Sequence, residues 1–348
     1  MVNDLLSITV IATVFVFGLL VFVHELGHFA TAKWTGMRVD EFAIGFGKSI
    51  FSVRRGETLY SLRLIPLGGF NKIAGMDPDE EQDERSFQSK PIWARMLVIV
   101  AGSAMNFLLP VLLFAIVFFS AGIDKVSPEP VIGSVMAERP AERAGFLQGD
   151  RIQSVNGTTI ATWSQFVAAV QGQAGQPLEI TVVRDKATVT TKVVPEFDPK
   201  GNRGVIGVMP IIENQKVGIF EAMGLSVKQT YVVASGMLVG IGQMVSGQIA
   251  AEVAGPIGVA QMTGQVAQLG ILPLLQFAAF LSINLGLINL FPVPVLDGGH
   301  IVTLAIEALR GKPLGRRSAQ IVQMIGMVLL LMLMALATMK DIARLNLF

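Results

Sequence analysis

An uncharged, apolar run from Leu5 to Val23 leads directly into the sequence His24-Glu25-Leu26-Gly27-His28. As a helix, such a run rises about 28 Å, close to the thickness of a bilayer core. Two histidines four residues apart share one helix face, and a glutamate beside the first can act on a water held by a metal. Because ionisable residues cost free energy inside a membrane, this run predicts a functional metal site on a transmembrane helix.

The composition agrees with a protein that crosses the membrane several times. Of 348 residues, 52% are hydrophobic and only 15% are charged, whereas soluble domains carry about 25% charged residues. The net charge of +1 gives no sign of nucleic-acid binding. The chain has no cysteine and three histidines, so disulfides are excluded and zinc would need histidine and carboxylate ligands.

Three further uncharged segments are long enough to span a bilayer. They are Met96–Gly122, Ile271–Phe291 and Ser318–Met339. The chain start, Met1–Asp4, has no basic residue and no cleavage site follows, which predicts that the first span is retained. The loop around Arg310 to Arg317 is purely basic, and the positive-inside rule therefore places it and loop 33–95 in the cytoplasm, with both termini outside. We expect a polytopic α-helical membrane protein with four spans.

The segment Gln229–Ala251 is also uncharged, but it is rich in glycine, serine and glutamine. If it crossed the membrane, Asp297 would end on the opposite side from His24. We therefore expect an amphipathic or peripheral helix at the interface, within residues 213–256. This segment would separate two membrane domains, residues 1–123 and 257–348.

Residues 124–212 predict a soluble, extracytoplasmic domain. Strand-like runs surround one helical stretch, Trp163–Val170; the runs are Val131–Val135, Leu178–Val183, Thr188–Val194 and Val205–Met209. The stretch from Pro140 to Ile152, with its Ala-Gly-Phe and Gly-Asp-Arg-Ile sequences and the turn that follows at Asn156-Gly157, resembles the PDZ family.

One segment of this domain resembles the carboxylate-binding loop of permuted bacterial PDZ domains; it comprises Gly204, Val205, Ile206 and Gly207. An ordinary core strand is the alternative. The domain would recognise a C-terminus or exclude substrates by size.

The third metal ligand has to come from elsewhere in the chain, and the segment from Asn289 to His300 is the best source. Pro292 and Pro294 interrupt the third span, which is tolerated at membrane depth only around protein or a water-filled cavity. Asp297 is the first charged residue after 44 uncharged ones. It could be a ligand or a helix N-cap. His300 is the competing ligand, for which a structural role is the other interpretation.

These motifs together resemble the site-2 protease family of intramembrane zinc metalloproteases, in its single-PDZ bacterial branch. The resemblance rests on His24-Glu25-Leu26-Gly27-His28, the PDZ-like region and Asn289-Leu290-Phe291-Pro292-Val293-Pro294-Val295-Leu296-Asp297-Gly298-Gly299, and it covers essentially the whole chain. It implies Zn²⁺ held by His24, His28 and Asp297, with Glu25 assisting attack by zinc-bound water.

The resemblance also implies residues that contact the substrate, namely Asn289, Pro292 and Pro294. For Asn289, a role in helix packing is the alternative. In the second span, Gly102 and Asn106 match a Gly-xxx-Asn pattern of the family. Helix packing and substrate contact are both open for Asn106.

A β-hairpin is predicted between the first two spans, with strands Lys48–Arg54 and Thr58–Ile65. It resembles the membrane-associated β-loop on the cytoplasmic side of the family, whose edge strand pairs with unwound substrate. We expect substrate contacts from Gly45, Gly47, Thr58, Tyr60 and Leu62. A plain cytoplasmic hairpin is the alternative.

The sequence therefore predicts a zinc endopeptidase that cuts transmembrane segments of single-span proteins. The resemblance implies a monomer in the bacterial inner membrane, with the active site near the cytoplasmic face. Its substrates would be anti-sigma factors or signal-peptide remnants, already shortened by another protease. The alternative is a PDZ-bearing scaffold or chaperone with a non-catalytic zinc site, against which the intact Glu25 argues. A metal transporter would carry polar residues through its spans, whereas here the charged groups lie at one depth.

Overall fold

The computed structural model describes residues 2–76, 80, 82–199, 201–249, 255–312 and 315–344. The predicted segments 124–212, 213–256 and the 310–317 loop therefore lie partly outside the described residues. The chain forms two compact units, residues 1–121 with 218–348, and residues 122–217.

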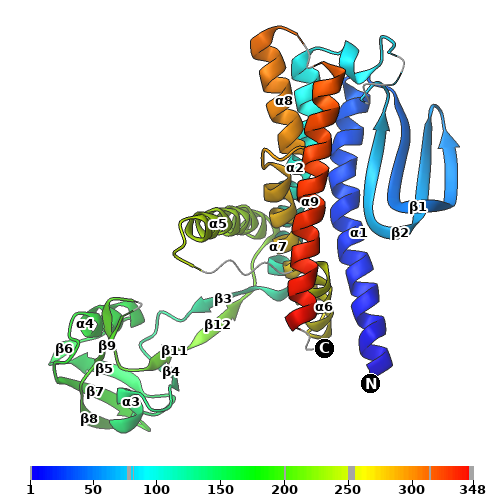
Figure 1. Cartoon of the computed structure of the whole chain (residues 1–348). Helices are drawn as coiled ribbons and strands as arrows, with labels where there is room; N and C mark the ends of the chain where they lie inside the picture. Colours follow the sequence, from blue (N-terminus) through cyan, green and yellow to red (C-terminus); the bar gives the residue numbers. More distant parts are fainter. Residues whose placement is uncertain are drawn as a thin grey trace. The chain divides into compact units, whose positions relative to one another are not determined.

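The helices and strands follow one another along the chain (Figure 1). The helices are α1 Val2–Trp34, α2 Ile92–Ala121, α3 Pro140–Arg143, α4 Trp163–Gln171, α5 Ile219–Val245, α6 Pro256–Gln268, α7 Ile271–Asn289, α8 Asp297–Arg310 and α9 Arg316–Arg344. The strands are β1 Val39–Arg55, β2 Thr58–Ile73, β3 Ile123–Val126, β4 Ile132–Val135, β5 Arg151–Val155, β6 Thr158–Thr159, β7 Leu178–Arg184, β8 Ala187–Val193, β9 Glu196–Asp198, β10 Arg203–Val205, β11 Val208–Pro210 and β12 Ile212–Gln215.

Four of the described helices are long and apolar enough to cross a membrane. They are Leu6–Trp34 in α1, Ile92–Ala121 in α2, Ile271–Asn289 in α7 and Gln320–Arg344 in α9. These helices coincide with the four predicted spans. The helix α1 continues without a break through His24 and His28, so the two histidines are held on a rigid element.

The core of the helical unit lies where α1, α2 and α7 meet. Val16 of α1, Leu113 of α2 and Ile283 of α7 belong to one buried cluster. Two adjacent alanines, Ala278 and Ala279, are completely buried on α7, and such small side chains allow helices to approach closely. This packing brings the C-terminal end of α7 to the helices that carry the histidines.

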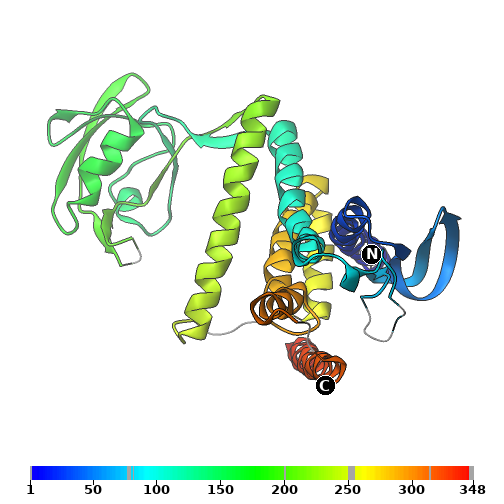
Figure 2. The ribbon, with the colours of Figure 1, turned by 90° about the horizontal axis from the view of Figure 1, so that it is seen from above.

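The helix α5 lies across the other long helices. In Figure 1 it is seen nearly along its axis while α1 and α9 run along the page, and in Figure 2 the two directions are exchanged. Its partly buried residues Val233, Ala234 and Met237 join the core cluster of α1, α2 and α7, whereas Phe220 is 90% exposed. It is not among the candidate spans of the described residues. Its placement at the membrane interface stays a prediction.

The hairpin of β1 and β2 is larger than expected. Residues 41–44 of β1 have partners on both sides: Glu41 pairs with Leu59 and Lys72, and Ile44 pairs with Leu62 and Gly69. Residues 58–63 also pair with 49–55. The two strands thus double back into a four-segment sheet, whose edges are 49–55 and 69–73. Figure 1 shows this sheet beside the C-terminal half of α1.

Residues 59–62 of the predicted strand Thr58–Ile65 therefore lie inside the sheet and not at its edge. Within it, Leu59 pairs with both Glu41 and Arg54, so its backbone groups are already satisfied by neighbouring segments. Gly45 has a φ of 91° and allows the chain to turn between the first two segments.

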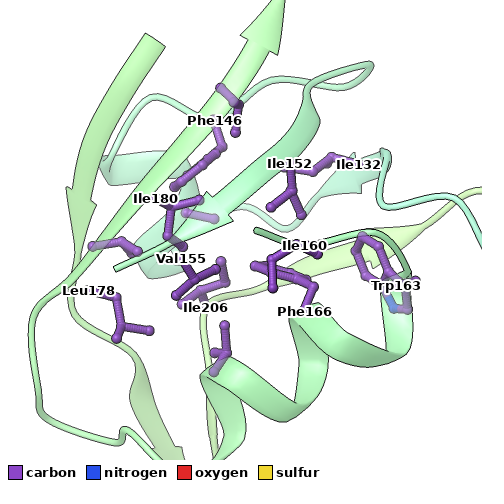
Figure 3. Packing of buried hydrophobic residues seen from close by; sticks show 14 residues of the cluster. Ile132, Phe146, Ile152, Val155, Ile160, Trp163, Phe166, Leu178, Ile180 and Ile206 are labelled. Carbon is purple, nitrogen blue, oxygen red and sulfur yellow. The ribbon is translucent and has the colours of Figure 1, made fainter. Parts of the chain in front are cut away.

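The second unit is a small β domain. Its largest sheet has the order β6-β5-β7-β8, with separate pairs β3–β12, β4–β11 and β9–β10. Figure 3 shows Phe146, Ile152, Phe166 and Ile180 of its core pointing toward one another from α4 and the surrounding strands and loops. The predicted helix Trp163–Val170 agrees with α4. The predicted strand Val205–Met209 is instead split into β10 and β11, because the chain turns at Gly207, whose φ is 83°.

Candidate metal centre

Three side chains that lie far apart in the sequence meet at one point. His24 and His28 come from the same face of α1, and Asp297 is the first residue of α8. One ligand atom from each lies within 4.8 Å of the other two. Nε2 of His24 and Nε2 of His28 are 3.2 Å apart, and these atoms lie 3.7 Å and 3.5 Å from the carboxylate oxygens of Asp297.

These separations fit a zinc ion. Nitrogen and oxygen ligands bound at about 2.0–2.2 Å in a tetrahedron lie roughly 3.3–3.6 Å from one another. Two histidines and one carboxylate also form a donor set known from catalytic zinc sites, which keep a fourth position open. The side chains of His24, His28 and Asp297 are only 11–13% exposed. Unpaired charges would be costly there, and a bound cation would offset that cost.

The main chain of α2 orients the ring of His28. Nδ1 of His28 lies 2.8 Å from the carbonyl oxygen of Val98, to which it donates a hydrogen bond. That bond leaves Nε2 free of a proton and directed at Asp297. Contacts of this kind fix the tautomer and rotation of a metal-binding histidine.

Asn106 of α2 contacts the ring of His24 at Nδ1, as the carbonyl oxygen of Val98 contacts the ring of His28. Its amide nitrogen lies 3.1 Å from Nδ1 of His24, and Asn106 is completely buried. When Nε2 binds a metal, Nδ1 carries the proton and donates it, so the amide must present its oxygen instead. Amide oxygen and nitrogen exchange by a half-turn of the group. The half-turn also gives a partner to Oδ1 of Asn106, a buried atom that otherwise has none among the residues the structure describes.

Two expected roles change with this geometry. The complete burial of Asn106 against His24 favours a positioning role over the predicted substrate contact. Asp297 does not cap its helix, because the N-cap residue of α8 is Leu296. Its Oδ2 accepts a 2.9 Å hydrogen bond from the hydroxyl group of Ser103.

The helix α2 can approach these side chains because it carries a glycine at the closest point. A Cβ atom at Gly102 would lie 2.2 Å from Nε2 of His28 and 2.8 Å from Cε1 of His24. A side chain there would displace both rings. Gly102, Ser103 and Asn106 thus each contact or border at least one ligand residue, although α2 supplies no ligand.

Asn289 and the two prolines come from the end of α7 and the turn that follows. The amide nitrogen of Asn289 lies 3.5 Å from Nε2 of His24, beside the ligand group. Pro292 and Pro294 lie in the connection between α7 and α8. This connection brings Asp297 back toward α1. His300 lies further along α8 and is not part of the three-residue group.

Glu25 follows the first ligand on α1, and its carboxylate accepts a 2.7 Å hydrogen bond from the amide of Asn71 in β2. No motif in the sequence pointed to Asn71, or to Ser103 as a partner of Asp297. Both contacts depend on the register between elements, which local patterns do not encode.

The expected hairpin contacts are mostly structural. Thr58 is buried and donates a 2.7 Å hydrogen bond to the carbonyl oxygen of Val39. The ring of Tyr60 packs against Phe29 and Phe42. Leu62 is 45% exposed.

Gly45 and Gly47 both have positive φ, between segments 39–44 and 49–55 of β1. The structure shows backbone or packing contacts for Gly45, Gly47, Thr58 and Tyr60, and their contacts with a substrate stay predictions.

The second unit carries a groove of about 450 Å³. Trp163, Phe166 and Val170 of α4 form an apolar side. The charged lining residues are Asp198, Arg203 and Arg139, of which Arg139 is paired with Glu196. All four residues of the predicted carboxylate-binding loop line the groove: Gly204, Val205, Ile206 and Gly207.

Comparisons with known proteins agree with the metal centre. A model of peptidase family M50 matches residues 12–333. The chain is 34% identical to "Zinc metalloprotease RasP" of Bacillus licheniformis and to "Regulator of sigma-W protease RasP" of Bacillus subtilis. Each match extends over 418 residues and covers 97% of this chain and 99% of the relative.

Similar solved structures cover only part of the chain. A solution structure of GtR34C from Geobacillus thermodenitrificans is 30% identical, covers 24% of this chain and 95% of that chain, and has a TM-score of 0.21. A crystal structure of the PDZ domain of an SdrC-like protein from Listeria monocytogenes is 21% identical, covers 25% and 93%, and has a TM-score of 0.22.

The family model spans most of the chain, and the relatives match over nearly their whole length. The four apolar helices and the three-ligand group fit a membrane protein that uses Zn²⁺. The chain belongs to peptidase family M50, the site-2 protease family, and is a zinc metalloprotease.

Proposed function

We propose that this protease cuts the transmembrane segments of single-span membrane proteins. The observation that carries the proposal is the group of His24, His28 and Asp297, with Glu25 beside the first ligand, on and between helices long enough to span a bilayer. A site built this way suits a peptide bond that lies at membrane depth.

The residues divide the chemistry among themselves. When bound, zinc polarises a carbonyl group and makes water a better nucleophile at neutral pH. Glu25 would take the proton of the attacking water and pass it to the leaving amine. Asn289, which lies beside Nε2 of His24, would donate a hydrogen bond to the carbonyl oxygen as charge develops on it.

The substrate would be held as an added strand. A helical segment has its backbone groups bonded internally and must be unwound before cleavage. The sheet edge 69–73 has a partner on one side, residues 39–44, and it reaches α1 at Glu25 through Asn71. An unwound segment that pairs with this edge would lie next to the metal centre. This edge replaces Thr58–Ile65 in the proposal.

The membrane orientation follows from the charges of the loops. The basic loop near Arg310 and the hairpin loop would lie in the cytoplasm, which puts the metal centre near the cytoplasmic face of the bacterial inner membrane. Residues 122–217 would be extracytoplasmic. The start of α1 and the end of α9 lie toward the same end of the helical unit in Figure 1, which supports this orientation.

The second unit would act as a PDZ domain that selects substrates. Its groove combines an apolar side with the loop 204–207, whose backbone N–H groups would suit the carboxylate of an apolar C-terminus. Substrates shortened by another protease would present such an end. The name of the Bacillus subtilis relative, a regulator of sigma-W, supports anti-sigma factors as one class of substrate. The enzyme would act as a monomer.

Cleavage of a fluorescently labelled single-span peptide by the purified full-length protein tests the proposal. Glu25→Gln should abolish cleavage and retain one zinc per chain, because the base is lost and the ligands remain. Glu213→Gln, a matched change at an exposed position of β12, is the control. Cleavage at the normal rate by Glu25→Gln would contradict the proposal. A zinc-loaded wild-type protein that cuts no membrane peptide would favour the scaffold alternative.

A further inference from the structure

A side-chain amide of the hairpin sheet holds the proposed base by two hydrogen bonds. Nδ2 of Asn71 lies 2.7 Å from the main-chain oxygen of Glu25 and 2.7 Å from its Oε2. The amide group has two N–H donors, and each finds one of these oxygens. One side chain therefore fixes both the backbone and the carboxylate of Glu25.

The chemistry of the two acceptors determines which way the amide faces. A half-turn would place Oδ1 of Asn71 against two oxygens that cannot donate, so the nitrogen must face Glu25. In this orientation Oδ1 is buried and has no hydrogen-bond partner among the described residues. An unpaired buried acceptor destabilises the fold. The amide thus leaves its oxygen unpaired while both donors are used on Glu25.

The strand that carries Asn71 lies directly against α1. Two residues earlier, a Cβ atom at Gly69 would lie 3.0 Å from Cγ of Glu25 and 2.9 Å from Cγ1 of Val21. Asn71 itself pairs with Phe42, on one side of the segment. The donor group for Glu25 therefore sits on an edge segment of the sheet, the one that we propose receives the substrate.

We propose that Asn71 is a positioning residue that orients the carboxylate of Glu25 for proton transfer. The inference rests on the proposed function of Glu25 and adds a link between substrate docking and the base. When a substrate strand pairs with residues 69–73, it orders the segment that holds the Asn71 amide. Docking at this edge thereby keeps Glu25 in its productive orientation.

Two substitutions distinguish the hydrogen bonds that Asn71 donates from the packing of its side chain. Asn71→Leu keeps the approximate shape of the side chain but removes both N–H donors. Asn71→Gln keeps the donors on a side chain that is one methylene longer. Misplacement of a catalytic group by about 1 Å can cost about 100-fold in rate. We therefore expect kcat for the labelled single-span peptide to fall about 10- to 100-fold in Asn71→Leu and to recover in part in Asn71→Gln.

Zinc content, KM and thermal unfolding are measured beside kcat on the purified full-length variants. Zinc content and KM should stay at wild-type values, because neither a ligand nor the backbone edge is removed. The matched control is Asn214→Leu, an exposed strand position in the second unit. A normal kcat in Asn71→Leu, or a loss confined to KM or to zinc content, would overturn the inference.

The same assay distinguishes this inference from the proposed function. If Glu25→Gln is inactive while Asn71→Leu has normal kcat, only the positioning role fails. If Glu25→Gln itself cuts normally, the proposed function fails. If Asn71→Leu does not fold, Asn71→Gln decides the matter. A Gln variant that folds and binds zinc but has kcat below one-hundredth of the wild-type value would contradict the inference that the amide donors orient Glu25.

Discussion

The hydroxyl group of Ser103 donates a 2.9 Å hydrogen bond to Oδ2 of Asp297 and so connects α2 to the first turn of α8. Ser103 is almost completely buried, at 1% exposure. The carboxylate that completes the metal centre is therefore oriented by a residue of a different helix. Hydrogen bonds to metal ligands of this kind often change metal affinity by about 10- to 100-fold.

Ser103→Ala should weaken zinc binding by about tenfold, because Asp297 loses the donor that fixes one of its oxygens. Competition with a chromophoric chelator measures the affinity. Ser103→Thr retains the hydroxyl group and is the matched control. Equal zinc affinity in the wild type and Ser103→Ala would show that the hydrogen bond does not hold the ligand.

Asn106→Asp should keep zinc affinity near that of the wild type, whereas Asn106→Leu should lower it about 10- to 100-fold. A carboxylate oxygen accepts the proton of Nδ1 of His24, and leucine offers no acceptor. The same chelator competition applies. The reverse order, with leucine better than aspartate, would mean that the amide oxygen does not face His24.

Asp297→Ala should lose zinc, and His300→Ala should retain it. Asp297 lies within 3.7 Å of both histidine nitrogens, while His300 lies outside the group of three. Zinc content per chain after gel filtration is the measurement. Loss of zinc from His300→Ala with retention in Asp297→Ala would reassign the third ligand.

The stability of the second unit should depend on pH through Asp150. Asp150 is completely buried and bonds Arg184 through Nε and Nη2 at 2.7 Å each. Burial acts to raise the pKa of Asp150, but the hydrogen bonds from Arg184 and from the N–H of Leu147 hold it below its ordinary value.

A carboxylate whose pKa is lowered by folding stabilises the native state above its unfolded pKa, which is about 3.9. The contribution is lost as the pH falls from there through the lowered pKa of the folded state. Thermal unfolding of a full-length protein with Trp34→Phe and Trp93→Phe, in which Trp163 is the remaining tryptophan, should therefore show a drop in stability below about pH 4 that is absent when Asp150→Asn is added. Asp150→Asn should itself cost about 1.5 kcal/mol, because the hydrogen bonds of Arg184 to a carboxylate become hydrogen bonds to a neutral amide. An identical pH dependence in both proteins would contradict this role.

The sequence was informative about the metal centre because its ligands lie in short motifs with helical spacing. His24 and His28 are four residues apart and share one helix face wherever the helix begins or ends. Asp297 stands out because it follows a long uncharged stretch. The contacts of Ser103 with Asp297 and of Asn71 with Glu25 were not predictable, since they depend on how helices and sheet are placed against one another.

The hairpin shows why local patterns failed there. Pro66 and the glycines that follow it usually end a strand, and we therefore expected β2 to stop at Ile65. The strand instead continues to Ile73. This extra length forms the edge that carries Asn71, so an incorrect strand end concealed a proposed part of the site.

The helix α2 borders the metal centre through Val98, Gly102, Ser103 and Asn106, yet every ligand comes from another helix. Metal affinity and ligand identity are thus encoded in separate stretches of the chain. Substitutions along one face of α2 could adjust how tightly zinc is held, or how readily it exchanges, while the coordinating atoms stay the same. An inhibitor that wedges between α1 and α2 could likewise disable the enzyme without binding the metal.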